Sequence, residues 1–134
     1  MKFFRELEPD VYLGVGKLET EQDGHGWTGE YDALLARGRL MAIIVTDGDR
    51  PLPPAGKPMI LWMKTRKAEL ARLVAGTVHV IEDEEERGSM ERALPGRAKA
   101  SPYPVAIAAT EAEALEKARV ILDHAVAEAC AAVK

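Results

Sequence analysis

Carboxylate side chains follow two of the apolar runs in this sequence, at the points where those runs end. The runs are LMAIIVT and TVHVI, and the acidic residues are Asp47, Asp49, Glu82 and Asp83. If both runs are parallel strands, their carboxyl ends meet at one edge of a sheet, where open α/β sheets bind ligands. Carboxylate oxygens are also the ligands that Mg²⁺ and Ca²⁺ prefer. The sequence therefore predicts a small-ligand or divalent-metal site at this edge, with these residues as its ligand-binding groups.

The same residues have a commoner explanation in local structure. Asp47-Gly48-Asp49 has the composition of a turn. Glu82 and Asp83 open the acidic stretch EDEEE, where the helix macrodipole favours negative charge. Asp-Gly-Asp also lacks the further ligands and the glutamate of a calcium loop. Both interpretations stay open, no cofactor is predicted, and no residue is assigned to a particular metal.

Other residues capable of chemistry do not form a recognisable constellation. None of the three histidines has a second histidine or a cysteine at metal-binding spacing. His25 stands close to Asp23, but an acid–base pair needs a fixed geometry that a glycine-rich segment does not provide. No serine lies in a Gly-x-Ser-x-Gly elbow, and Gly14-Val15-Gly16 lacks the third glycine of a dinucleotide fingerprint. No catalytic residue is predicted, and an enzyme using Asp23 and His25 ranks last.

Charge and composition favour a globular protein that binds neither nucleic acid nor membrane. Acidic residues outnumber basic ones by 22 to 18, and there is no basic stripe of the kind that nucleic-acid binders carry. No apolar run approaches the roughly 20 residues that span a bilayer. The charged start MKFFRELEPD does not resemble a signal peptide, and the lone Cys130 fits a reducing compartment. We expect a cytoplasmic protein.

Five segments have the composition of strands. The central one is Leu40 to Asp47, whose β-branched run is typical of a strand buried on both faces. Before it, the segments at 3–7 and 11–18 are joined by a Glu-Pro-Asp turn and predict an antiparallel hairpin. After it, TVHVI at 77–81 and YPVAIAA at 103–109 predict two further strands.

Helical patterns lie between these strands. A glycine-rich loop at 19–29 leads into a helix whose apolar stripe comprises Trp27, Tyr31, Leu34 and Leu35, with Gly38 as its left-handed cap. The proline-rich segment at 48–57 predicts a loop, and a second helix follows at 58–75, stopped by Gly76. A third helix is expected to stop at Pro95, before a loop at 96–102. The fourth begins at Thr110, where Glu113 completes a capping box.

Strands and helices alternating at this spacing predict parallel strands with right-handed crossovers. The predicted fold is therefore α/β, one mixed and mostly parallel sheet of about five strands with four helices. The length of 134 residues predicts a single domain spanning residues 1–134.

Several stretches resemble the SpoIIAA-like proteins, the superfamily of the STAS domain (sulfate transporter and anti-sigma-factor antagonist). They are EYDALLARG before LMAIIVTD, WMKTRKAELARLVAG before TVHVI, and YPVAIAATEAEALEKA near the C-terminus. The resemblance covers the chain from about Val11 onward and implies a SpoIIAA-like fold. It also implies a regulatory module that acts through contacts with a protein partner.

One departure from the STAS pattern concerns its regulatory phosphorylation site. Regulatory STAS proteins carry a phosphorylatable serine or threonine in the turn after the central strand. Here that turn reads DGDRP at 47–51, and no hydroxyl residue stands between Thr46 and Thr65. The phosphorylation switch therefore does not carry over.

The first hypothesis is thus a non-enzymatic, STAS-like protein-interaction module, and the alternative is a small-ligand or metal-binding domain using the acidic edge. A homodimer is a further hypothesis, because exposed tryptophans such as Trp62 are enriched at interfaces.

Overall fold

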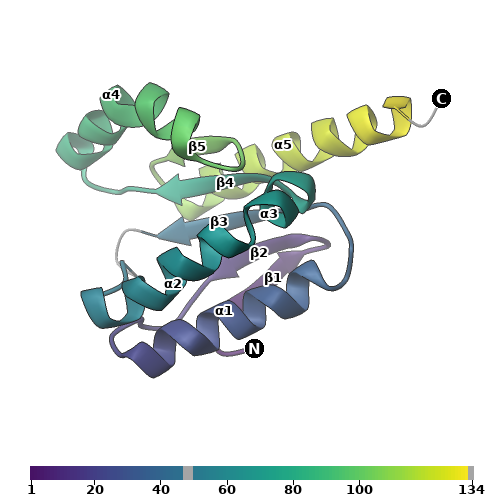
Figure 1. Cartoon of the computed structure of the whole chain (residues 1–134). Coiled ribbons are helices and arrows are strands. Elements are labelled where there is room, and N and C mark those ends of the chain that lie inside the picture. Colours follow the sequence, from purple (N-terminus) through teal and green to yellow (C-terminus); the bar gives the residue numbers. More distant parts are fainter. Residues whose placement is uncertain (47–49, 133–134) are drawn as a thin grey trace.

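The described residues form one sheet of five strands in the order β1-β2-β3-β4-β5 (Figure 1). The computed structural model describes residues 1–46 and 50–132 of the chain. The strands are β1 (Phe4–Glu8), β2 (Val11–Gly14), β3 (Met41–Thr46), β4 (Val74–Val80) and β5 (Val105–Ala108). β1 and β2 pair antiparallel, whereas β2 to β5 run parallel. The predicted α/β class and the mixed, mostly parallel sheet are confirmed.

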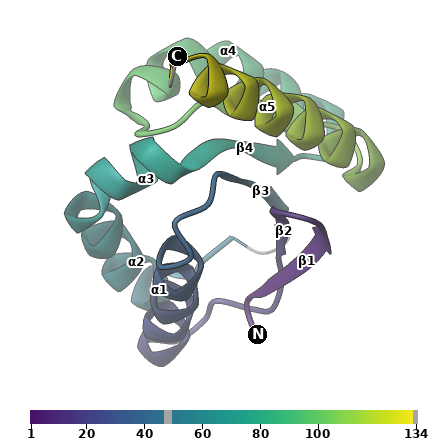
Figure 2. The same cartoon turned by 90° about the vertical axis from the view of Figure 1, so that its right-hand side faces the viewer.

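Helices cover both faces of this sheet. They are α1 (Glu21–Leu35), α2 (Pro53–Thr65), α3 (Lys67–Leu73), α4 (Glu84–Ala100) and α5 (Glu111–Ala132). In Figure 2, α1, α2 and α3 lie on one side of the strands and α5 lies on the other. α4 follows the carboxyl end of β4 and has no fully buried side chain among those described.

The alternation of side chains along the strands explains the two layers of core. Tyr12 and Ile43 point to the face covered by α1 and α2, whereas Leu13 and Ile44 point to the α5 face. β3 is therefore buried on both faces, as its apolar run predicts. The helical stripe that begins at Trp27 also packs into the first of these clusters, as expected.

Residues 1–46 and 50–132 form five helices rather than the four predicted. The helix expected at 58–75 begins earlier, at Pro53, in a segment predicted as loop, and it is interrupted at Arg66. Proline is acceptable in the first helical turn, because those amides have no partner within the helix. Pro53 and Pro54, at the first two positions of α2, are therefore compatible with a helix in a segment whose proline content predicts a loop.

The predicted stop at Pro95 is also wrong, since α4 continues through it to Ala100. A proline removes one amide donor from the helix, but Pro95 is exposed, so water can satisfy the carbonyl that loses its partner. The segment 96–102 predicted as loop is therefore largely helical. This lengthening carries Arg97 onto a helix.

The glycine-rich segment at 19–29, predicted as a loop, is mostly helical because α1 begins at Glu21. A capping box starts it. The Asp23 amide donates to Thr20 Oγ1 at 3.1 Å, and the Asp23 carboxylate accepts from the Thr20 amide at 3.0 Å. Threonine and aspartate at this spacing are the sequence signal that marks the true start of the helix.

Two glycines mark close approaches between elements rather than breaks in them. At Gly24, a Cβ atom would lie 2.4 Å from the Ala55 carbonyl oxygen, so the glycine allows α1 to touch α2. At Gly76, which is inside β4 and not a helix stop as predicted, a Cβ would lie 2.8 Å from Ile121 Cγ2 of α5. Glycine has no Cβ, so both contacts are allowed only with this residue.

Candidate functional site

A pocket of about 390 Å³ opens at the carboxyl ends of β3 and β4. In Figure 1 these strand ends lie between α2 and α4, on the left of the view. The lining residues come from the strand ends, α1, α2, α4 and the connections between them. They are Leu18, Trp27, Val45, Thr46, Arg50, Pro51, Met59, His79, Ile81, Met90 and Arg97. The pocket therefore lies at the sheet edge where the sequence predicts a ligand site; here we call it the carboxyl-edge pocket.

Apolar side chains held by the core form one wall of the carboxyl-edge pocket. Trp27 of α1 and Met59 of α2 are buried in the cluster that covers the first face of the sheet. The Gly24 contact brings these two helices together and so fixes the spacing of the wall. Behind it, the Trp27 ring meets the rings of Tyr31 and Trp62 at centroid distances of 5.1 and 5.5 Å. These edge-on contacts restrain the indole.

The tryptophans differ in exposure from the interface anchors that the homodimer hypothesis invokes. Trp27 is only 9% exposed. Trp62 is half-buried against the same core, as its position off the apolar stripe predicts. Ile60, expected in the buried stripe of its helix, is instead 57% exposed.

Basic side chains form the other wall. His79 lies near the end of β4, Arg50 precedes α2, and Arg97 stands in the last turn of α4. Burial lowers the pKa of His79, and the positive charges of Arg97 and Arg50 lower it further. The imidazole is therefore neutral near pH 7, and the fixed charges among the described lining residues are the two guanidinium groups.

Two of the four acidic residues predicted as ligands, Glu82 and Asp83, make local contacts around the start of α4. The Asp83 carboxylate caps α4 by accepting from the Glu86 amide at 2.8 Å. Glu82 is exposed, and its backbone carbonyl accepts from Arg87 Nη1 at 3.2 Å. Neither of these two acidic residues lines the pocket, and Asp47 and Asp49 lie outside the described residues. Within 1–46 and 50–132, no group of three or more histidine, cysteine or acidic residues is placed to hold a metal ion.

Asp23 and His25 are not paired with each other. The Asp23 carboxylate accepts from the Glu19 and Thr20 amides, each at 3.0 Å. His25 Nε2 lies 3.5 Å from a carboxylate oxygen of Glu21, and both side chains are exposed. These contacts belong to a helix start and a helix surface, so they give the acid–base hypothesis no support.

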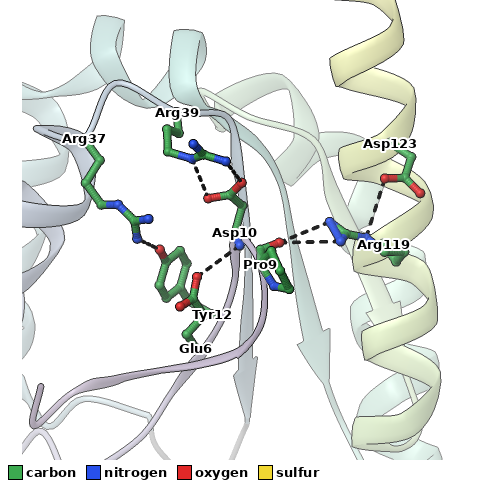
Figure 3. Close-up of polar contacts among 8 residues, drawn as sticks. All are labelled: Glu6, Pro9, Asp10, Tyr12, Arg37, Arg39, Arg119 and Asp123. Atoms are coloured by element: carbon green, nitrogen blue, oxygen red, sulfur yellow. Dashed lines mark hydrogen bonds and ion pairs between the residues drawn. The ribbon is translucent and has the colours of Figure 1, made fainter.

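The sheet end opposite the pocket carries a second polar cluster (Figure 3). Asp10, in the turn between β1 and β2, has a positive φ of 65° and accepts from Arg39 at 3.0 and 2.8 Å. Its amide donates to the Glu6 carboxylate at 3.2 Å. Arg37 donates to the hydroxyl of Tyr12.

Arg119 of α5 joins the same cluster by donating to the Pro9 carbonyl at 3.3 and 3.5 Å. Its Nε also lies 3.4 Å from a Glu8 oxygen and 3.6 Å from an Asp123 oxygen. The cluster thus ties the hairpin turn to α5 and to the connection before β3. Its charges are directed at one another, which is the arrangement of a structural crosslink.

The sequence points to the edge of the sheet at which the pocket opens, but not to the basic residues Arg50, His79 and Arg97 that line it. His79 lies in the segment at 77–81, for which the sequence predicts a strand and no site. Arg97 lies in the segment at 96–102, which the sequence predicts as a loop after a helix that stops at Pro95. The one sequence signal for Arg50 is its position directly after the turn that ends the central strand, which is a common place for ligand contacts.

Comparison of the chain with protein-family models, with curated proteins and with solved structures gives no match. Among the described residues, no helix combines the length and apolar character that crossing a membrane requires.

Proposed function

We propose that this protein is a non-enzymatic binding module whose site is the carboxyl-edge pocket. The observation that carries this proposal is the pocket's place at the carboxyl ends of adjacent parallel strands, where α/β proteins bind ligands. Its volume of about 390 Å³ falls within the range of roughly 300–1,000 Å³ found for small-molecule sites.

The lining also has the character of a small-molecule site. Most of its described lining residues are apolar, and a few are polar or charged. Such sites bind through apolar contact and gain orientation from those few groups. Because Trp27 and Met59 belong to the core, their wall is already formed before a ligand arrives.

A pocket-filling variant tests the proposal. Val45 is half-buried and lines the pocket, so Val45→Trp should fill it. Val120 is 68% exposed on α5, on the other side of the sheet, so Val120→Trp is a matched control. In a ligand-observed NMR screen of neutral, anionic and cationic fragments, hits on the wild type should disappear with Val45→Trp and remain with Val120→Trp. No hits, or hits indifferent to Val45→Trp, would reject the pocket as the site.

A divalent-metal site beside the pocket is a separate alternative, and it rests only on the sequence positions of the acidic residues that follow β3 and β4. In this alternative Asp47, Asp49, Glu82 and Asp83 supply the oxygen ligands. It predicts calorimetric binding of Mg²⁺ or Ca²⁺ that Asp47→Asn weakens without unfolding the protein. If titrations with both ions showed no heat of binding, the metal hypothesis would be rejected and the small-molecule proposal would be unaffected.

The STAS-like resemblance supports a second candidate, a cytoplasmic protein-interaction module that binds no nucleic acid. The observation in its favour is an exposed apolar surface at the start of α2 and along its outer face, formed by Leu52, Ile60 and Leu61 with exposed fractions of 49, 57 and 57%. We take a second copy of the chain as its occupant. Light scattering should then show a dimer that Ile60→Lys with Leu61→Lys converts to monomer; a wild-type monomer at all concentrations would contradict it.

A further inference from the structure

We infer that the ligand of the carboxyl-edge pocket is an organic anion, with a carboxylate or phosphate group on an apolar body. This inference rests on the proposed function, since it assigns a chemical class to the ligand of the same site. It follows from the charge of one wall and the apolar character of the other.

The charged wall is built from two separate elements. Arg50 comes from the connection between β3 and α2, and Arg97 comes from α4, yet both line the pocket. The same two arginines also line an adjoining hollow of about 270 Å³ with Glu86 and Ser89. A single anion between the arginines would therefore contact both elements at once.

Neither arginine forms an ion pair within the described chain, not even with Glu86 in the adjoining hollow. By contrast, Arg39, Arg66 and Arg119 at other sites each lie within 4.0 Å of a carboxylate oxygen. Guanidinium groups match carboxylate and phosphate oxygens through paired N–H donors, so these two arginines favour an anionic group.

His79 adds a polar group that responds to an anion. It lies on β4 in the same pocket, and its pKa is lowered by burial first and then by Arg97 and Arg50. A bound anion would offset the charges of the arginines. The neutral imidazole can also donate one hydrogen bond to an anionic oxygen.

The apolar wall requires that the ligand be more than an inorganic ion. Leu18, Trp27 and Met59 line the pocket from the side of α1 and α2. Ile81 also lines it, and Met90 of α4 adds apolar surface next to the two arginines. Burying them against an apolar group is favourable in proportion to the area removed from water. Methionine side chains adapt to the shape of such a group. A free inorganic anion would leave this wall without a contact.

Three small aromatic probes separate these contributions: phenyl phosphate, phenylacetate and the neutral 2-phenylethanol. Isothermal titration should show both anions binding at least about tenfold more tightly than the alcohol, because hydrogen bonds to charged groups are stronger than neutral ones. Arg50→Gln and Arg97→Gln should each weaken the anions about tenfold and leave the alcohol unchanged. Arg92→Gln, also on α4 but outside the pocket lining, is the matched control and should change neither.

The outcomes distinguish the inference from the proposed function. Tighter binding of phenyl phosphate or of phenylacetate would tell which acid group the site prefers. If the alcohol bound as tightly as the anions and the arginine variants had no effect, the inference would be overturned while the pocket remained a binding site. If inorganic phosphate bound as tightly as phenyl phosphate, the inference that the ligand has an apolar body would be overturned. If no probe bound and Val45→Trp also changed nothing in the fragment screen, both proposals would fail. All of the replaced arginines are exposed, so unfolding of the variants is not expected.

Discussion

Replacement of Gly24 by alanine tests the contact that sets the spacing of the pocket wall. Alanine is the better helix former, by about 1 kcal/mol per residue in a helix interior. On helix propensity alone, Gly24→Ala should therefore stabilise α1. The structure predicts the opposite, because α1 and α2 touch at this position.

The magnitude follows from the atoms that a Cβ would meet. It would lie 2.4 Å from the Ala55 carbonyl oxygen and 2.7 Å from Pro58 Cγ, and the first of these is backbone that cannot rotate away. Forcing α2 outward is an overpacking change, which typically costs 1–3 kcal/mol, about 3 kcal/mol here because backbone must move. After the propensity gain, Gly24→Ala should lower the free energy of unfolding by about 2 kcal/mol.

Gly29→Ala supplies the control on the same helix. A Cβ at Gly29 would have no described heavy atom outside its helix within 4 Å. Only helix propensity and chain entropy then act, so this variant should raise the free energy of unfolding by about 0.5–1 kcal/mol. Urea unfolding followed by circular dichroism measures both values. Equal stabilisation by the two alanines would refute the close α1–α2 contact.

Other predictions concern the pH dependence of stability and the residues at the ends of strands and helices. Unfolded His79 takes up a proton near pH 6.5, whereas the folded residue does so only at lower pH. The free energy of unfolding should therefore fall as the pH drops through about 6.5 toward the lowered pKa of the folded residue. Urea unfolding at pH 7.5 and at pH 5 should show a smaller loss of stability for His79→Gln than for the wild type. Asp10→Asn keeps a residue that tolerates a positive φ but removes the charge beside Arg39. It should lower the free energy of unfolding by at most about 1 kcal/mol, measured by thermal melting at pH 7. The difference should vanish in acid once the wild-type carboxyl, whose pKa is lowered chiefly by the Arg39 hydrogen bond, is protonated. Thr110→Ala should cost about 1 kcal/mol in the same assay, whereas Thr110→Ser should cost less, because Thr110 Oγ1 accepts from an amide of the first turn at 3.1 Å.

Much of the fold could be predicted because its signals are local and periodic. The apolar run around Ile43 is typical of a strand covered on both faces, as the structure has it, and the Thr110–Glu113 spacing marks the start of α5. The left-handed conformation expected at Gly38 is present, with a φ of 68°, although the C-cap of α1 is Ala36, two residues earlier. These signals depend on chemistry within a few residues.

The errors arose where tertiary packing overrides local preference. Gly24 suggested a loop, whereas its lack of a side chain serves a contact with α2, far along the chain. Pro53 and Pro95 suggested breaks, yet one occupies a first helical turn and the other an exposed helix face. A single sequence does not show which of these uses a glycine or proline has.

The candidate site was predictable in position but not in charge. Parallel strands bring their carboxyl ends together whatever residues follow, so the edge was known from topology. Arg97 enters the pocket only because α4 runs past Pro95, and His79 only because the side-chain alternation of β4 turns it there. These placements depend on where whole elements end.

A ¹H–¹⁵N NMR titration of the wild-type protein with phenyl phosphate tests the proposed anion site directly. Binding at the carboxyl-edge pocket predicts that the largest amide shifts cluster at Val45, His79, Ile81 and Arg97. Shifts centred on the exposed face of α2, near Ile60, would place the ligand elsewhere. An unchanged spectrum at millimolar probe would contradict the proposed anion site.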